Sequence, residues 1–290
     1  EHKIFGLLFL YLKIPHIVFI NIQRKEVKKN MKQYKWEDVE GVKFYTNGIT
    51  CTDIDIPSEV KTVSFIYPKI EISKHSDKIF SDVEELRIGR NVIGISIPNR
   101  MFPNVKKVVS KSSGFLDSKY LIERTGFRLL NAFEQAEDIP IDFSQFIRVN
   151  PYAFDGCKSK SIINLTESHA LIARENAFSG SGFMELPFVD GMKRCGSVVF
   201  DVDEDADEIT LPKEKLHYFP KKRVKCAKVQ NVKNMKIVSK MPKKIILEDD
   251  DVSSDDAILH SLGGYGIEEI VSDVPRYKSK DGILYSSDMK

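Results

Sequence analysis

The side chains best suited to nucleophilic chemistry are four cysteines and six histidines, spread over a chain of 290 residues. A cysteine nucleophile requires a histidine base in contact with it. Cys157 with His169, or Cys226 with His217, could supply the two groups, but neither pair stands in the motif of a known cysteine enzyme. The histidines also lack HExxH or comparable metal-ligand spacing. We therefore predict no enzymatic activity, no metal site and no cofactor, and interpret the cysteines as reduced, mostly buried thiols.

Aspartate alternates along residues 201–207, in DVDEDAD, as it does at the start of a calcium-binding loop. Such a loop needs glycine at its sixth position and a bidentate glutamate at its twelfth. Ala206 and Pro212 occupy those positions here. We therefore interpret the run as an exposed acidic turn.

A basic segment, residues 213–244, is the strongest candidate for binding, because it holds twelve Lys or Arg side chains and a single acidic one, Glu214. If these cations lie on one face, they form a positive stripe that attracts an acidic protein, a polyanion or a phosphate backbone. The candidate partner-binding residues are Lys222, Arg223, Lys225, Lys236, Lys243 and Lys244.

Acidic runs at 201–208 and 248–256 flank the basic segment and offer a second interpretation. They could neutralise the cations within the molecule and leave a solvated charged surface, which is what charge runs usually are. Tyr218 and Phe219 are the only aromatic residues of the segment, so its capacity to stack on bases is small. The sequence argues against a nucleic-acid partner and leaves an acidic protein or glycan open.

The elements that must position these side chains are indicated by an internal repeat. An apolar pattern of the form φ-x-x-φ-x-φ begins at Val60 and at Val83, and its first half begins again at Val105. A second series in the same phase consists of Ile141, Ile163, Leu186 and Ile209. Both series advance by nearly constant steps, as the units of a solenoid do. A single match of this kind occurs often by chance, but a shared phase does not.

Turn signals repeat together with the apolar pattern. AFDGC at 153–157 and AFSGS at 177–181 are about one repeat apart, and each stands just ahead of a strand signal. Proline follows other strand signals, in IDIP at 54–57, ISIP at 95–98 and ITLP at 209–212. Proline has no N–H to give to a strand ladder, so it belongs where a strand ends.

These motifs resemble the leucine-rich repeat proteins of the BspA-like type, whose repeats run approximately AF-x-G-C/S and then L-x-x-I-x-I-P. The segment L-x-x-L-x-L-x-x-N-x-L of the wider superfamily is matched by Val83, Leu86, Ile88, Asn91 and Ile93. The resemblance covers residues 54–212 well and 213–275 loosely. It implies a curved right-handed repeat solenoid, α/β or mainly β, with coils of about 22–24 residues and a parallel sheet of short strands.

In such a solenoid each coil supplies one short strand and stacks its apolar side chains on the next coil. We expect Val83, Leu86 and Ile88 to point inward, and the side-chain amide of Asn91 to satisfy turn groups that the ladder does not reach. Lys160 and Asp138 replace the leading apolar residue of their repeats, so we expect those coils to be distorted.

The repeat boundaries divide the chain into six parts. We expect an apolar then basic N-terminal segment at 1–30, an N-terminal cap at 31–53, leucine-rich repeats at 54–110, a partly helical insertion at 111–137, further repeats at 138–275, and a truncated hairpin or the start of a further segment at 276–290. In the last part, Asp281-Gly282 is a turn signal whose partner strand we expect to be missing.

Residues 1–30 have two competing interpretations. The apolar stretch 4–20 is interrupted by Lys13, Pro15 and His16, so its unbroken part is too short for a bilayer span. The segment is either a genuine packed or membrane-proximal helix, or a leader outside the folded domain with Met31 as the natural start. The second alternative implies a cytoplasmic protein, whereas membership of a larger exported protein implies the cell surface or secretion.

We expect a noncatalytic scaffold that presents an extended face to a protein or glycan partner, as the resemblance also implies. The alternative is a structural spacer or adhesion segment of a larger surface protein. Hydrophobic residues at 42% and charged residues at 30% exclude wholesale disorder, and the net charge of +2 by itself identifies no partner.

Overall fold

The computed structural model describes residues 33–248 and 266–286, with the exception of 167, 239, 241, 273 and 276. The described residues from Tyr34 onward belong to one compact unit. The expected N-terminal segment, 1–30, lies outside the described residues. None of the described helices is long and apolar enough to cross a membrane.

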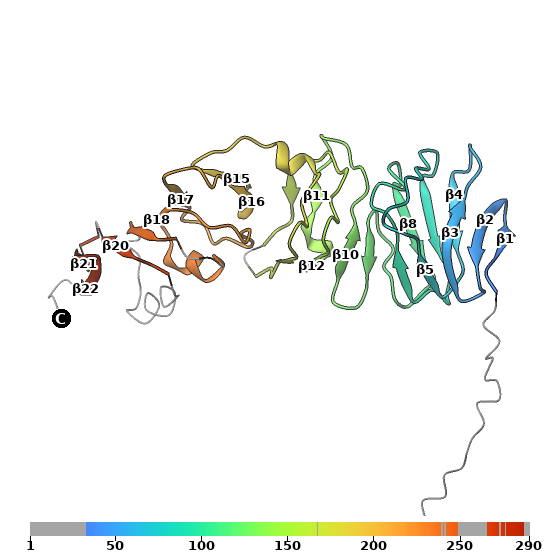
Figure 1. The fold of residues 1–290 in the computed structure, drawn as a ribbon, viewed down its shortest axis with the longest axis horizontal. Helices are drawn as coiled ribbons and strands as arrows, with labels where there is room; N and C mark the ends of the chain where they lie inside the picture. The colour runs from blue at the N-terminus through green and yellow to red at the C-terminus, as the bar shows by residue number, and fades with distance from the viewer. Residues whose placement is uncertain are drawn as a thin grey trace, which may run out of the picture. The chain divides into compact units, whose positions relative to one another are not determined.

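Successive turns of the chain lie side by side and pair mostly through short parallel strands, so the described residues form a β-solenoid of about nine coils (Figure 1). The prediction of a repeat solenoid is confirmed. Helix is almost absent from the described residues, where the helical elements are the 3-10 turns η1 (Phe143–Gln145), η2 (Gly182–Glu185) and η3 (Val232–Lys236).

One parallel sheet comprises β4 (Thr62–Phe65), β6 (Glu85–Ile88) and β8 (Lys107–Ser110). Leu86 of β6 lies in register between Val63 and Val108, and these three side chains are at most 1% exposed. The prediction that Leu86 points inward and stacks on the neighbouring coils is confirmed. Because side chains alternate along a strand, Glu85 and Arg87 lie on the outer face.

The residues after β6 depart from the superfamily pattern. Asn91 is exposed and its side chain makes no hydrogen bond with another described residue, so its expected role in the turn is wrong. The N–H of Gly89 instead donates to the carbonyl of Phe65 in the preceding coil at 2.8 Å, an approach that leaves no room for a Cβ. Val92, 1% exposed, takes the core position that the pattern assigns to Ile93, which is 68% exposed.

A second sheet runs along another side of the same coils, in the order β1 (Lys35–Val39), β2 (Val42–Thr46), β3 (Thr50–Asp55), β5 (Lys69–Glu71) and β7 (Gly94–Ser96). Strands β1, β2 and β3 pair antiparallel, whereas β3, β5 and β7 pair parallel. The antiparallel strands therefore precede the first parallel pair, in the region where we expected an N-terminal cap.

The expected helical part of residues 111–137 is a β-hairpin, so that prediction is wrong. β9 (Leu121–Glu123) and β10 (Arg128–Asn131) pair antiparallel across a turn in which Gly126 and Phe127 have positive φ. Leu121, Ile122 and Leu129 are all nearly fully buried. Since adjacent residues on both faces of the hairpin are buried, its apolar residues do not alternate and their spacing imitates a helix.

Two parallel ladders follow, built from β11 (Ile141–Asp142), β12 (Arg148–Val149), β13 (Ile162–Ile163) and β14 (Ile172–Ala173). In the first, Ile141 pairs with Ile162, not with Ile163 as the repeat predicted. Ile163 is 43% exposed, so its expected inward position is wrong. A shift of one residue exchanges the two faces of a strand, and Lys160 is in the repeat where we expected distortion.

The strand expected at Leu186–Phe188 is not formed. Leu186 ends the 3-10 turn η2 and still packs against the core, while Phe188 is 43% exposed. Gly182 lets the chain approach the preceding coil closely: its N–H donates to the carbonyl of Cys157 at 2.7 Å, and a Cβ would lie 2.4 Å from the carbonyl oxygen of Lys158. The hairpin of β15 (Met192–Cys195) and β16 (Val198–Val202) comes next.

The last parallel sheet comprises β17 (Ile209–Leu211), β18 (Cys226–Val229), β19 (Lys244–Leu247) and β20 (Glu269–Ser272). Ile209, Ala227 and Ile245 are in register and at most 1% exposed, although these coils are shorter than those of the first sheet. Met235 lies fully buried in η3.

The final segment is a complete hairpin within the described residues. β21 (Tyr277–Lys280) and β22 (Ile283–Ser286) pair antiparallel. Asp281 and Gly282 have φ of 53° and 77°, as a two-residue hairpin turn requires. The turn signal is confirmed, and the expectation that its partner strand is missing is wrong.

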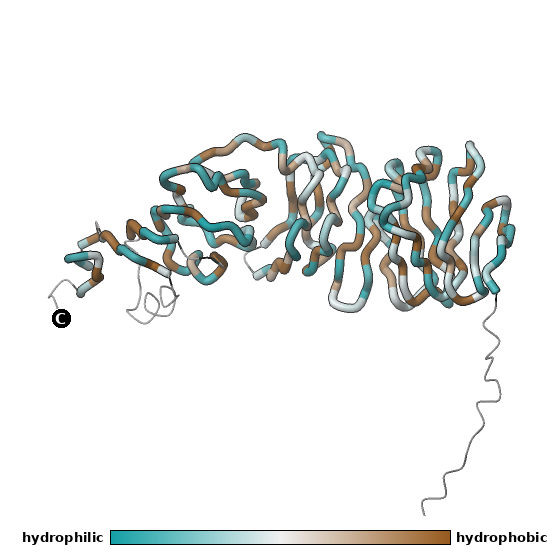
Figure 2. The backbone as a smooth tube through the Cα atoms, viewed as in Figure 1, coloured by the Kyte–Doolittle hydropathy of each residue, from teal (hydrophilic) through white to brown (hydrophobic). Residues whose placement is uncertain are grey.

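The repeated Ala-Phe motif places aromatic rings in a ladder inside the middle coils. Phe143, Phe154 and Phe178 stack with interplanar angles of 10° and 11°, and Phe183 meets Phe154 edge-on. All four rings are at most 3% exposed. Figure 2 shows brown apolar and teal polar stretches alternating along the chain, as the stacking of one face of each coil requires.

Two isoleucines of one coil, Ile88 and Ile93, test which residues belong to the core. Ile88→Ala removes a side chain that is 1% exposed beside Phe65, so we expect a loss of about 2–5 kcal/mol in the free energy of unfolding. Ile93→Ala changes a side chain that is 68% exposed, so we expect a change within about 0.5 kcal/mol. Urea denaturation measures both, and equal losses would contradict the register.

Candidate functional site

The basic segment does not form a free positive stripe. Lys222 lies 2.8 Å from a carboxylate oxygen of Asp201 and 3.7 Å from Glu204. The hydrogen bond to Asp201 raises the pKa of Lys222 above its ordinary value. Asp201 belongs to the acidic run 201–208, so this run neutralises part of the basic segment, as the second interpretation of the sequence holds.

Three more of the six predicted cations have carboxylate partners in an adjacent coil. Lys225 lies 3.2 Å from Asp207. The other two contacts, at 2.9 and 3.1 Å, join Lys243 to Glu268 and Lys244 to Glu269. Of the second acidic run, 248–256, only Glu248 is described, and it accepts a hydrogen bond from Gln230.

Arg223 and Lys236 are the two predicted cations that form no ion pair with a described residue. Arg223 is exposed just before the buried Val224, and Lys236 is exposed on η3. The structure therefore does not bring the six predicted residues together as one unpaired cluster. Arg223 and Lys236 therefore have no ion-pair partner among the described residues and are available to an external charged partner.

The same cross-coil pairing organises charge on the first parallel sheet. Glu84 lies 2.9 Å from Lys106 of the next coil and 3.4 Å from Lys61 of the preceding one. These hydrogen bonds, the one from Lys106 first, lower the pKa of Glu84 below its ordinary value. Exposed pairs of this kind contribute little stability, but they place positive and negative side chains next to one another on the outer face.

Three of the four cysteines, Cys51, Cys157 and Cys226, are buried where thiolate chemistry is disfavoured. Burial raises the pKa of Cys157 to about 11, and burial also raises the pKa of Cys226. The sulfur of Cys226 lies 3.9 Å from Glu208, while Nδ1 of His217 lies 2.7 Å from the hydroxyl of Ser197. A raised thiol pKa leaves little nucleophile at neutral pH.

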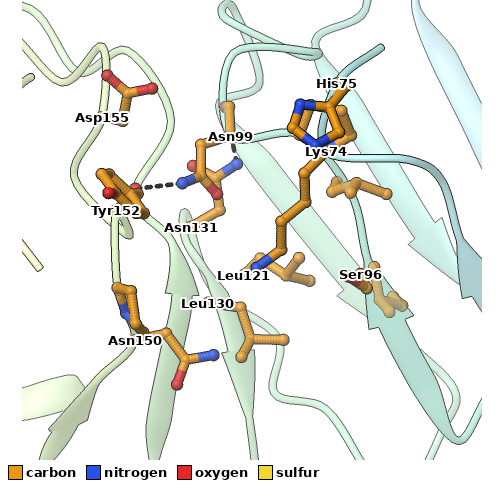
Figure 3. A pocket seen from close by; sticks show the side chains of 14 residues that line it. Lys74, His75, Ser96, Asn99, Leu121, Leu130, Asn131, Asn150, Tyr152 and Asp155 are labelled. Carbon is orange, nitrogen blue, oxygen red and sulfur yellow. Dashed lines mark hydrogen bonds between the residues drawn. The ribbon is translucent and has the colours of Figure 1, made fainter. Parts of the chain in front are cut away.

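A cavity of about 380 Å³ lies where β7 and the chain after it face β9, β10 and the turn after β12 (Figure 3). Its apolar side is formed by Ile95 of β7, Leu121 of β9 and Leu130 of β10. Its polar side is formed by Ser96, Asn99, Asn131, Asn150, Tyr152 and Asp155, and Lys74 and His75 also line it. Ligand sites combine an apolar lining with a few convergent polar groups in this way.

The cavity exists because one coil does not complete its side strand. Residues 114–116 lie beside β9, since the N–H of Leu116 donates to Ile122 and that of Arg124 donates to Gly114. The chain then turns away, and Ser118 pairs with Val108 of the first sheet. No described strand therefore pairs with the outer edge of β7.

A network of hydrogen bonds fixes the polar wall. The amide nitrogen of Asn131, which is 1% exposed, donates to the carbonyl of Asn99 at 2.9 Å, and its oxygen accepts from the N–H of Phe133 at 2.7 Å. The side chain of Asn99 in turn donates to the carbonyl of Tyr152 (Figure 3). Tyr152 has a φ of 60°, which presents its half-exposed ring beside the cavity.

The acidic group of the lining is already neutralised. Asp155 accepts two hydrogen bonds from Arg100, at 2.7 and 3.1 Å. This contact raises the pKa of Arg100 above its ordinary value. Lys74, in contrast, forms no ion pair with a described residue, and Figure 3 shows its side chain extending across the cavity toward Leu121.

The sequence does not indicate this cavity. Its asparagines, Asn99, Asn131 and Asn150, have no common motif or repeat spacing. The one available signal is the interruption of the repeat at 111–137, because an interrupted coil leaves its neighbours without a complete strand. The interpretation of residues 111–137 as a partly helical insertion predicts no cavity at this position.

No family model, curated protein or solved structure matches the chain in the three comparisons that we made.

The four thiols provide a test of the burial pattern. At pH 8, a pKa of about 11 leaves roughly one thiol in a thousand ionised, so we expect Cys51 and Cys157 to react very slowly with Ellman's reagent in the native protein. Cys195 is half-buried and should react first. In concentrated guanidinium, used as a control, all four should react at once. Equal native rates would contradict the assignment.

Proposed function

We propose that the chain is a noncatalytic leucine-rich-repeat-like scaffold that presents an extended face to a protein or glycan partner. The observation that carries the proposal is the in-register stacking of parallel strands, which aligns outward side chains of successive coils in rows. Adjacent strands are about 4.8 Å apart, so a row offers groups at regular intervals to an extended ligand. The BspA-like resemblance of the repeat motifs supports the same function.

The cations that serve such a face are those without an internal partner. Arg223 and Lys236 fit this role, whereas Lys222, Lys225, Lys243 and Lys244 are engaged with carboxylates. An acidic partner would have to displace an existing ion pair to reach the second group. We therefore place the partner-binding contribution mainly on Arg223 and Lys236.

A structural spacer or adhesion segment of a larger surface protein is the second candidate. The cross-coil ion pairs favour it, because they use surface charge within the molecule instead of leaving it for a partner. A spacer needs stacked coils but no recognition residues. The two functions therefore differ in whether the full chain binds any defined ligand.

Charge reversal at the two unpaired cations separates the candidates. The full chain is applied to a defined glycan array and to a set of purified acidic proteins, and the Arg223→Glu, Lys236→Glu double variant is compared with it. We expect binding that falls about tenfold in the variant, because two favourable contacts become repulsive.

Lys111→Glu is the matched control, since Lys111 is exposed and forms no ion pair with a described residue. It should bind as the unmodified chain does, and circular dichroism should be the same for all three proteins. Retained binding in the double variant would remove these two residues from the site. Absence of binding to every probe would favour the spacer.

A further inference from the structure

We propose that the cavity between β7 and β9–β10 binds a saccharide that carries a carboxylate, such as a uronic acid. This inference goes beyond the proposed function, because the cavity lining includes neither Arg223 nor Lys236 and forms a second, separate binding site. The shape of the cavity, its hydrogen-bonding groups and its charge all favour such a ligand.

The cavity has the size and the two-sided lining that a sugar ring requires. Its volume of about 380 Å³ is near the lower end of the range for small-molecule sites, roughly 300–1,000 Å³. Leu121 is 1% exposed and lies beside the half-buried Ile95 and Leu130. Ile95 and Leu130, which keep part of their surface exposed, offer an apolar surface to the C–H face of a pyranose, and the opposite wall offers polar groups.

The polar groups suit hydroxyls. A side-chain amide both donates and accepts hydrogen bonds, as a sugar hydroxyl does. The amide of Asn150 points into the cavity in Figure 3 and makes no hydrogen bond with another described residue. The hydroxyl of Ser96 on β7 is also without a described partner. Because Asn131 and Asn99 hold the wall in place, ligand binding need not include the full entropic cost of ordering it.

The charge of the lining selects an acidic ligand. Asp155 is paired with Arg100, so it does not neutralise Lys74. Lys74 therefore contributes an uncompensated positive charge over an apolar floor, among the described residues. A carboxylate on the sugar would accept a charge-assisted hydrogen bond from this ammonium group, and such bonds are stronger than neutral ones.

The test measures binding of named sugars to the full chain by isothermal titration calorimetry. The probes are D-glucuronate and D-galacturonate, their neutral counterparts D-glucose and D-galactose, and acetate as the carboxylate alone. We expect each uronate to bind about tenfold or more tightly than its neutral counterpart and than acetate. Lys74→Gln should remove most of this preference, and Asn150→Leu should weaken the binding of both uronates and neutral sugars.

Lys111→Gln is the matched control, because it removes an exposed cation away from the cavity lining. It should leave uronate binding unchanged. Equal affinity for glucuronate and glucose, acetate binding as tight as glucuronate, or a loss in Lys111→Gln as large as in Lys74→Gln would overturn the proposal. Undetectable uronate binding would also overturn it. If array binding through Arg223 and Lys236 persists in that case, only this inference fails and the proposed function stands.

Discussion

The stacking of each coil on the next is the interaction on which the rest of the structure depends. A short coil cannot bury its own apolar side, so Leu86 needs Val63 on one side and Val108 on the other. The same constraint holds in the last sheet, where Ile209, Ala227 and Ile245 stack although their coils are shorter. The length of a coil can therefore vary, provided that the inward residues remain in register.

The register of the buried residues determines which outward side chains of adjacent coils lie next to one another. The outward residues of adjacent strands are brought within reach of one another, so charges of opposite sign pair between coils, as Glu84 does with Lys106 and Lys222 does with Asp201. A segment that is strongly basic in sequence thus becomes a mixed surface in the folded chain. The proposed binding face therefore relies on the cations that form no ion pair with a described residue, Arg223 and Lys236.

The cavity lies where the regular stacking of one coil on the next is interrupted. Residues 111–131 form a hairpin and an incomplete side strand, so the outer edge of β7 is left without a strand among the described residues. The space is bounded by apolar residues from one side and by polar groups, among them the hydrogen-bonded Asn99 and Asn131, from the other. A departure from the repeat is therefore what gives this solenoid a concave, polar site.

The sequence by itself determined the repeat, its phase over residues 60–108, the repeated Ala-Phe turn signals and the turn at Asp281-Gly282, because each of these depends on local spacing and on residue type. It did not determine the register at Ile163, the 3-10 turn before Leu186 or the hairpin at 121–131. In each case the spacing of the apolar residues fits more than one backbone path. Contact with the neighbouring coil decided which path forms and which apolar residues are buried. The candidate site divides in the same way. The sequence identified Arg223 and Lys236 as cations, but only the tertiary structure showed that their four companions are paired. Only the tertiary structure brought Lys74, Asn131 and Asn150, which are far apart in the sequence, into one cavity.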